Sequence, residues 1–251
     1  MKIVGVAGGE GIGLGMVECI RMGQRARIVI QNASFHNSLD RAMWEQLEEH
    51  ALGLAEDDHL KVIVVEGAGR QFSIGYDLRE LVSLDLIQAQ AGLNQMERAL
   101  VAMEAIEVPV VCALRGFALG GGLALALTAD LRVADDTVRL GMPVTGLGIA
   151  ISETFAGRLL SAFGEAKTRE LLFLGEFMRG SDAVVLGAVH RIVGRRELDR
   201  VVEEWQSLIT GMSSEALRKT KRALTRTTRK LSPGAPELVG KMALEARFFG
   251  A

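Results

Sequence analysis

The sequence predicts an α/β fold built on parallel strands, with a helical C-terminal region. Between residues 17 and 134, segments of strand character alternate with segments of helical periodicity. Continuous apolar runs at 62–65 and 110–114 are typical of strands that are buried on both faces of a parallel sheet. From residue 152 onward the pattern is mostly helical. This order favours parallel strands that are joined through helices.

The expected elements follow one another in a simple order along the chain. Two short strands joined by a turn near Gly23 come first, and a polar loop separates them from a helix. The expected ranges are 17–20 and 27–30 for the strands, 32–38 for the loop and 40–56 for the helix. Next come a strand at 62–65, helices at 78–84 and 89–106, and a strand at 110–114 that Pro109 opens. A glycine-rich loop at 116–122, a helix at 123–128 and a strand at 130–134 complete the series.

Three parts of the chain are expected: a flexible lead at 1–15, an α/β core at 16–195 and a helical region at 196–251. The lead is rich in glycine but does not match the dinucleotide-binding spacing Gly-x-Gly-x-x-Gly. Leu14 and Met16 stand where the third glycine would be, so no Rossmann-type site is predicted. Pro233 and Pro236 mark the obvious interruption in the C-terminal region.

The composition excludes several classes of protein. With 251 residues, of which 49% are hydrophobic, the chain can bury a sizeable core in one large domain. Its net charge of −2 gives no overall basic field to attract nucleic acid or an anionic membrane. No apolar run reaches the roughly 18 residues that a membrane-spanning helix needs. Cys19 and Cys112 lack metal-ligand spacing and are expected to be buried thiols. A cytoplasmic protein without a metal site is predicted.

Two glycine-containing segments carry the strongest functional signal. One contains Phe72-Ser73-Ile74-Gly75-Tyr76-Asp77-Leu78, and the other contains Gly120-Gly121-Gly122. Each follows a buried strand and precedes a helix. Glycine lets the backbone approach a ligand, and the first N–H groups of a helix have no partners within it. Two such N–H groups directed at one carbonyl oxygen form an oxyanion hole, although a glycine triplet alone also suits tight helix–strand packing.

Together, the two segments resemble the crotonase superfamily (enoyl-CoA hydratase/isomerase). The shared pattern is Phe-Ser-x-Gly-x-Asp-Leu, followed further along by Pro-Val-x-Cys-Ala-x-x-Gly-x-Ala-x-Gly-Gly-Gly. The resemblance covers about residues 17–249 and includes 140–143, 146–148 and 183–193, the last of which looks like a strand of the family. It implies a spiral of ββα units with a helical C-terminal trimerisation region.

The resemblance also implies where the chemistry lies. The backbone N–H groups of Ile74 and Gly121 would hold the oxygen of a thioester whose acyl group is carried by coenzyme A or phosphopantetheine. No separate cofactor is implied, and the expected assembly is a homotrimer or a hexamer. The residues expected to contact the substrate are Ser73, Gly75, Gly120, Leu123, Ala124, Val144 and Ile151.

The chain departs from the family's hydratases at two positions. Those hydratases carry one glutamate in the pattern Gly-Gly-Gly-x-Glu and another directly after a proline, and these positions are Ala124 and Val144 here. Water addition needs groups that activate water and protonate carbon, so hydratase activity is not expected. Tyr76 and Glu153 remain as polar candidates. Tyr76 would orient a carboxylate or deliver a proton, and Glu153 would act as a base or simply be a favourable first-turn acid of a helix.

These residues leave three functions open. An acyl-thioester decarboxylase needs the oxyanion hole, an apolar pocket and a proton donor, whereas an isomerase needs a base such as Glu153. A non-catalytic acyl-thioester binder or scaffold would equally lack the two glutamates. An enzyme that acts on acyl groups held by a carrier protein is the third possibility.

Two other features have structural as well as functional explanations. Asp77 is expected to cap the helix that begins at Leu78. The basic residues between positions 218 and 230 are expected to form mainly a solvated helix face. In relatives that the chain resembles, C-terminal lysines often reach the 3′-phosphate of coenzyme A.

Overall fold

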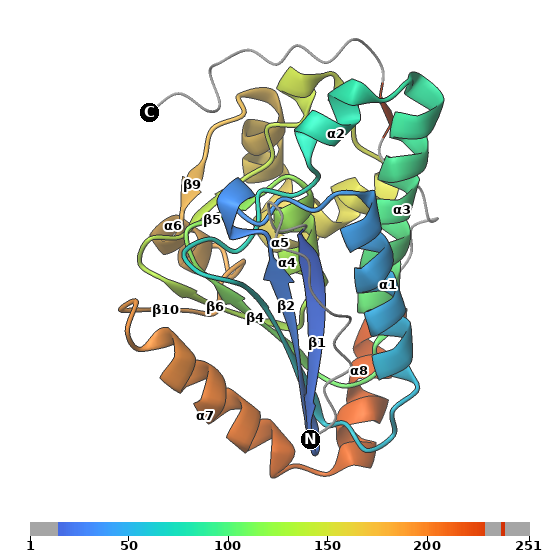
Figure 1. The fold of residues 1–251 in the computed structure, drawn as a ribbon. Helices are drawn as coiled ribbons and strands as arrows, with labels where there is room; N and C mark the ends of the chain where they lie inside the picture. The colour runs from blue at the N-terminus through green and yellow to red at the C-terminus, as the bar shows by residue number, and fades with distance from the viewer. Residues whose placement is uncertain (1–14, 229–236, 239–251) are drawn as a thin grey trace.

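The computed structural model describes residues 15–228 and 237–238 and has the α/β fold that the sequence predicts. Its centre is a six-stranded sheet with the order β1-β2-β3-β4-β6-β10 (Figure 1). The β1–β2 pair is antiparallel, and the later pairs in this sheet are parallel. The strands are β1 (Met16–Met22), β2 (Arg25–Gln31), β3 (Val62–Gly67), β4 (Val110–Leu114), β6 (Leu131–Asp135) and β10 (Arg191–Val193).

Helices cover both faces of this sheet (Figure 1). Helices α1 (Arg41–Ala55) and α3 (Leu86–Ala105) pack side by side on one face. Helix α7 (Leu198–Thr210) lies against the other face. Helix α8 (Ser214–Thr228) follows α7. The sheet is therefore the middle layer of three, as expected for parallel strands.

Strand β3 shows why its sequence is a continuous apolar run. Ile63 and Val65 belong to the large core that includes α1 and α3. Val62 and Val64 belong to the smaller core beneath α7. Successive side chains of a strand point to opposite faces, so a strand with a core on both sides needs an apolar residue at every position. The expected two-sided burial at 62–65 is confirmed.

Side-chain caps fix where the helices begin. Asp77 accepts a hydrogen bond from the Arg79 N–H at the start of α2 (Leu78–Ser83), which confirms the expected cap. Asp40 and Ser152 cap α1 and α5 (Glu153–Phe173) in the same way. These caps place the first turns of α2 and α5 beside the pocket described below.

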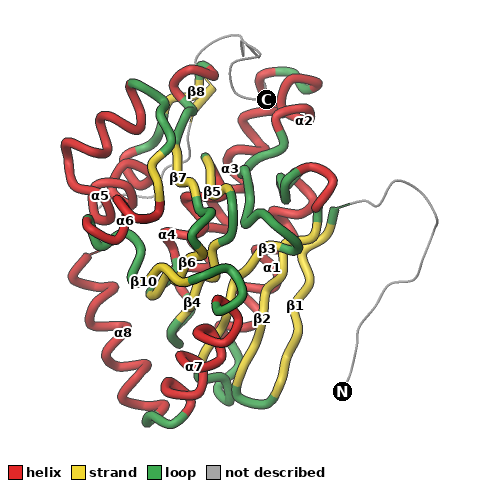
Figure 2. Tube along the Cα trace, turned by 90° about the vertical axis from the view of Figure 1, so that its left-hand side faces the viewer, coloured by secondary structure: helices red, strands yellow, loops and turns green. Residues whose placement is uncertain are grey.

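A small sheet and short elements lie at the upper end of the central sheet, next to α4 (Figure 2). Its strands are β5 (Phe117–Leu119), β7 (Arg139–Gly141) and β9 (Met178–Arg179), and α4 spans Gly121–Thr128. The remaining elements are β8 (Ile149–Ala150), β11 (Glu237–Leu238), α6 (Gly180–Val185) and 3-10 turns at Ala33–Phe35 and Thr145–Leu147.

The structure corrects two of the expected elements. The loop expected at 116–122 contains β5, and α4 begins within the glycine triplet at Gly121. The segment 183–193 is not one strand, because its first residues form the end of α6 and only 191–193 pair with β6. The expected helical C-terminal region is present in α7 and α8, and the short strand β11 pairs with β8. Most of the expected lead and both Pro233 and Pro236 lie outside the described residues.

The basic residues of α8 mostly pair with acids of this chain. Lys221 is buried and donates to the Asp130 carboxylate at 2.7 Å and to the Val108 carbonyl oxygen at 2.8 Å. Arg222 pairs with Glu107. These contacts attach α8 to the segment before β4, so Lys221 is not part of a solvated face. A contact of this helix with coenzyme A stays a prediction.

Candidate active site

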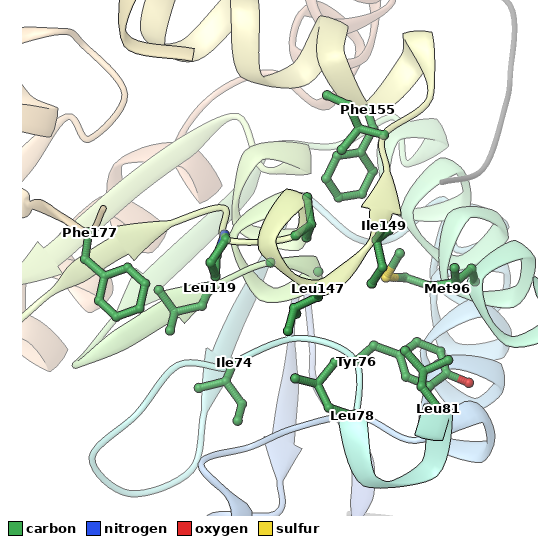
Figure 3. Close-up of a pocket in the computed structure, with 16 residues that line it drawn as sticks. Ile74, Tyr76, Leu78, Leu81, Met96, Leu119, Leu147, Ile149, Phe155 and Phe177 are labelled. Carbon is green, nitrogen blue, oxygen red and sulfur yellow. The ribbon is translucent and has the colours of Figure 1, made fainter. Parts of the chain in front are cut away.

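An apolar pocket lies where α2, α3, α4, α5 and β5 meet (Figure 3). Six of the residues predicted for the site line it, and they come from three separate segments of the chain. These residues are Ile74, Tyr76, Gly120, Gly121, Val144 and Ile151. The fold therefore brings the two glycine-containing segments together, as the sequence predicts, and adds the segment that follows Pro143.

The remaining lining residues were not predicted from the sequence. They are apolar and come from elements far apart in the chain: Leu78, Leu81, Leu93, Met96, Leu119, Pro143, Leu147, Ile149, Phe155 and Phe177. Helical periodicity indicates which of them face inward but not which face a cavity rather than solid core. No signal in one sequence separates these two outcomes.

The two glycine-containing segments are in direct backbone contact. A Cβ atom added at Gly75 would lie 2.5 Å from the Gly121 nitrogen and 2.8 Å from the Leu119 carbonyl oxygen. Gly75 also has a φ of +88°, a backbone conformation that residues with a side chain rarely adopt. No other residue fits this position, so Gly75 allows the approach of the loop 73–76 to the first turn of α4.

Ser73 holds the loop in place and does not face the pocket. Its hydroxyl donates to the Asn37 carbonyl oxygen at 2.7 Å and accepts from the Gly75 N–H at 3.0 Å. Ser73 is fully buried. The predicted substrate contact of Ser73 is wrong in this structure, because its hydroxyl donates to Asn37 and accepts from Gly75 instead.

The structure also corrects the predicted donor at Ile74. The N–H of Ile74 donates to the His36 carbonyl oxygen at 3.3 Å, so it is not free to bind a ligand. Only the side chain of Ile74 lines the pocket. The loop after β2 approaches the site in this way, through its backbone rather than through the His36 ring.

A second N–H group in the same loop has no partner among the described residues. Leu39 forms a parallel bridge with Tyr76, and its two hydrogen bonds go to the neighbours of Tyr76: the Gly75 oxygen and the Asp77 N–H. In a parallel bridge the opposed residue directs its own N–H away from the partner strand. The Tyr76 N–H is therefore left without a bond on the side away from Leu39, in a residue that lines the pocket.

The first turn of α4 supplies the other candidate donor. Gly121 is the first residue of the helix, so its N–H has no acceptor within α4. The preceding Gly120 has a φ of +52° and a ψ of −122°, a conformation that favours glycine. The positive end of the α4 dipole adds to the attraction of negative charge at this point.

The side chain of Tyr76 lies on the wall of the pocket with its hydroxyl turned away. Figure 3 shows the hydroxyl oxygen beside Leu81, at the end of the ring farthest from Ile74. The hydroxyl is buried and makes no hydrogen bond of ordinary geometry with the described residues. Burial raises the pKa of the Tyr76 hydroxyl far above its usual range, and the nearby Glu80 carboxylate raises it further. The phenol thus stays protonated at neutral pH.

Glu153 does not reach the pocket. It is the first residue of α5 and is exposed, whereas its neighbours Ile151 and Phe155 line the cavity. The predicted role as a base is therefore wrong in this structure, and a first-turn acid that suits the helix dipole explains the residue. Leu123 and Ala124 are also buried in the core rather than in the pocket lining, so their predicted substrate contacts are corrected in the same way.

The chemical character of the lining follows from these positions. Among the described residues that line the pocket, Tyr76 has the one titratable side chain, and none carries a carboxylate or an imidazole. Position 124 is alanine and position 144 is valine. The described part of the chain also has no group of three or more His, Cys, Asp or Glu residues arranged to hold a metal ion. What the pocket offers a ligand is mainly apolar surface.

A comparison with family models shows to which family this chain belongs. The model described as enoyl-CoA hydratase/isomerase matches residues 23–247. The chain belongs to the enoyl-CoA hydratase/isomerase family. This confirms the resemblance to the crotonase superfamily, and the family acts on acyl-CoA thioesters.

Relatives of the family agree with this assignment. A protein of Mycobacterium bovis named "Probable enoyl-CoA hydratase" is 30% identical over 190 residues, which are 76% of this chain and 73% of the relative. The short-chain-enoyl-CoA hydratase of Clostridium acetobutylicum is 26% identical over 205 residues, 81% of this chain and 78% of that protein.

Solved structures of the enoyl-CoA hydratase/isomerase family share the fold. An enoyl-CoA hydratase/carnithine racemase from Magnetospirillum magneticum has a TM-score of 0.81 and 25% identity, covering 88% of this chain and 84% of its own. The enoyl-CoA hydratase of Bacillus anthracis has a TM-score of 0.79 and 26% identity, covering 83% and 82%. In the part of this family member that the structure describes, no helix is both long and apolar enough to cross a membrane.

Proposed function

We propose that the pocket binds an acyl thioester and stabilises its enolate with the N–H groups of Tyr76 and Gly121. The observation that carries this proposal is the position of the two N–H groups. Both belong to residues that line the pocket, and the segments that contain them touch through Gly75. Negative charge that develops on the thioester oxygen would be held by two hydrogen bonds in an apolar surrounding, where such bonds are strong.

Decarboxylation is the reaction that this lining supports best. The bond between Cα and a carboxylate breaks, carbon dioxide leaves, and the electron pair forms the enolate, to which a proton from water then adds at Cα. No general base is needed. An apolar lining also disfavours the charged carboxylate of the substrate relative to the spread charge of the enolate. Isomerisation needs a base to move a proton, and Glu153 lies outside the pocket.

The oxyanion hole can be tested without knowledge of the natural substrate. Acetoacetyl-CoA forms an enolate with a characteristic ultraviolet band, and a site that stabilises the enolate lowers the pKa of the bound thioester. We expect the wild type to shift the midpoint of this band to lower pH. The proposed stabilisation is refuted if bound acetoacetyl-CoA titrates as it does in free solution.

A matched pair of variants isolates the Gly121 N–H. Gly121→Pro removes the N–H at the first position of a helix, where proline is well tolerated. Gly121→Ala adds a similar Cβ against the Met96 sulfur but keeps the N–H. Loss of one such donor costs about 2.7–4 kcal/mol. The proline variant should therefore lose most of the enolate band and the alanine variant should retain more of it. Equal losses would assign the effect to packing.

A non-catalytic acyl-thioester binder is the second candidate. The same observation favours it, since a pocket with apolar walls and two N–H groups binds a thioester without any further group. Turnover of malonyl-type and 3-enoyl CoA esters separates the candidates. Release of carbon dioxide from the malonyl-type ester supports the decarboxylase, migration of the double bond supports an isomerase, and binding without turnover of any ester supports the binder.

A further inference from the structure

The helix α3 has a glycine in its interior, directly behind the Tyr76 ring. Gly92 is buried and lies seven residues into a helix of 20 residues. A Cβ atom at this position would be 2.2 Å from the Tyr76 hydroxyl oxygen and 2.9 Å from its Cζ atom. Glycine weakens a helix interior, so this position has a cost that a packing requirement explains. The requirement here is room for the end of the Tyr76 side chain.

The surroundings leave the ring one direction in which to move. The ring is 5% exposed, so core atoms surround it except where it borders the pocket. The backbone of Tyr76 is held on both sides by the two hydrogen bonds to Leu39, at 2.8 and 2.9 Å. A side chain at position 92 would therefore push the ring rather than the backbone, and it would push it into the cavity.

Helix α3 itself cannot easily withdraw from the ring. On one side it packs along α1. On another, the buried Arg158 of α5 binds the α3 residues Glu97 and Glu104, with distances of 2.7 and 2.6 Å. Charged groups buried in this way are held firmly because separation leaves each of them uncompensated. Extra volume at position 92 is thus not absorbed by a shift of the helix.

We propose that Gly92 is a specificity-determining residue, which receives the end of the Tyr76 side chain and so leaves the pocket open to a longer apolar acyl chain. The acyl chain would lie along the wall that the Tyr76 ring shares with Leu93 and Met96. This inference rests on the proposed binding of an acyl thioester in the same pocket. It adds the class of acyl group, one that extends into an apolar hydrocarbon chain, and the residue that sets the length of this chain.

The test measures binding of two saturated thioesters by calorimetry. Butyryl-CoA and octanoyl-CoA differ by four methylene groups, and each buried methylene strengthens binding by about fourfold at most. We expect the wild type to bind octanoyl-CoA more tightly than butyryl-CoA. Gly92→Ala should weaken octanoyl-CoA binding at least about tenfold and change butyryl-CoA binding by less than about threefold. A general structural defect would weaken both probes alike.

Gly53→Ala is the matched control for a glycine-to-alanine change inside a helix. Gly53 lies in α1, and an added Cβ would meet only an Arg21 nitrogen at the ordinary distance of 3.7 Å. This variant should bind both thioesters as the wild type does. If it loses octanoyl-CoA binding as Gly92→Ala does, the proposal is overturned.

A second-site change provides the rescue. Tyr76→Leu keeps the backbone N–H and removes the ring, so Gly92→Ala has nothing to displace in this background. We expect the double variant and Tyr76→Leu to bind octanoyl-CoA within about twofold of each other. A large difference between them would overturn the proposal, and this comparison holds even if Gly92→Ala alone does not fold.

The two proposals fail in different ways. If the wild type binds neither thioester and does not stabilise the acetoacetyl-CoA enolate, the proposed function is wrong, and this inference is wrong with it. If the wild type stabilises the enolate but Gly92→Ala binds both acyl esters as the wild type does, only the role of Gly92 is wrong. Octanoyl-CoA binding that is weaker than butyryl-CoA binding in the wild type would also refute it.

Discussion

The backbone N–H of Ile74 donates to the carbonyl oxygen of His36 across 3.3 Å. This bond ties the loop after β2 to the loop after β3, and it gives the Ile74 N–H a partner within the protein. Ile74 contributes a side chain to the pocket, whereas Tyr76 contributes an N–H without a protein partner among the described residues. In this loop, Ile74 thus provides the apolar contact and Tyr76 provides the N–H group.

Truncation of Ile74 should separate these two contributions. Ile74→Ala removes three carbon atoms from the pocket wall but keeps the backbone bond to His36. At about 0.8 kcal/mol for each buried carbon, partly offset by the exposure of Ile74, octanoyl-CoA binding should weaken about tenfold. The midpoint of the acetoacetyl-CoA enolate band should stay within about 0.3 pH units of the wild type, since 1 unit equals 1.36 kcal/mol. A larger shift would return Ile74 to the oxyanion hole.

A buried glutamine of α7 should be a site of easy stabilisation. Gln206 is fully buried, and neither its amide nitrogen nor its amide oxygen has a hydrogen-bond partner among the residues that the structure describes. Buried polar atoms without partners cost about 1–3 kcal/mol. Gln206→Met, which has a similar shape, should therefore raise the free energy of unfolding by about 1 kcal/mol in urea titrations.

Gln95→Met is the matched comparison for that change. Gln95 is also buried in a helix, but its amide donates to Glu48 at 2.6 Å and accepts from Arg98. Removal of bonds that are made should destabilise the protein by about 1 kcal/mol. If both variants change stability in the same direction, the difference in hydrogen bonding does not control these sites.

The sequence predicts the frame of the site better than its chemistry. The strand runs at 62–65 and 110–114 and the glycine-containing segments after them are local signals, and the structure places them as expected. Gly121 was a candidate through the resemblance to the family, whereas the expected helix start at 123 missed the first turn of α4, which begins at Gly121. The free N–H at Tyr76 was missed, because which N–H is bonded depends on Leu39 and His36, residues that only the folded chain brings near.

Glu153 also shows what a single sequence does not predict. Glu153 was a candidate base because it falls where some isomerases that the chain resembles place an acidic residue. One helical residue lies about 100° from the next, so neighbours of a pocket residue need not face the pocket. Ile151 and Phe155 line the cavity while Glu153 is exposed. A sequence predicts which side of a helix faces the interior only when the apolar periodicity of the helix is strong. The first turn of α5 contains too few residues to show such a periodicity.

The ion group between α3 and α5 should be essential for stability. Arg158 is bound by Glu97 through two hydrogen bonds of 2.7 and 2.9 Å and by Glu104 at 2.6 Å. Arg158→Met leaves buried carboxylates without this cation, which typically costs about 3–5 kcal/mol. We expect a correspondingly lower midpoint in urea unfolding. Arg169→Met, at an exposed pair with Glu165 on the same helix, should cost less than about 1 kcal/mol. Similar losses in both variants would contradict the assignment.

Stability should fall at mildly acidic pH because of one histidine beside β6. The Nδ1 atom of His190 accepts a hydrogen bond from the Arg132 N–H at 3.1 Å, which requires that this nitrogen carry no proton. Burial lowers the pKa of His190, and the positive charge of Arg132 lowers it further. The unfolded chain, with a histidine pKa near 6.5, therefore binds a proton at a higher pH than the folded chain does. By linkage, folding stability is constant above that value and decreases as the pH falls from about 6.5 toward the lowered folded pKa.

His190→Asn keeps an acceptor for the Arg132 N–H but does not titrate. Urea unfolding between about pH 7.5 and pH 5.5 should therefore show a smaller loss of stability in the variant than in the wild type. Parallel pH profiles for the two proteins would show that His190 does not control this dependence.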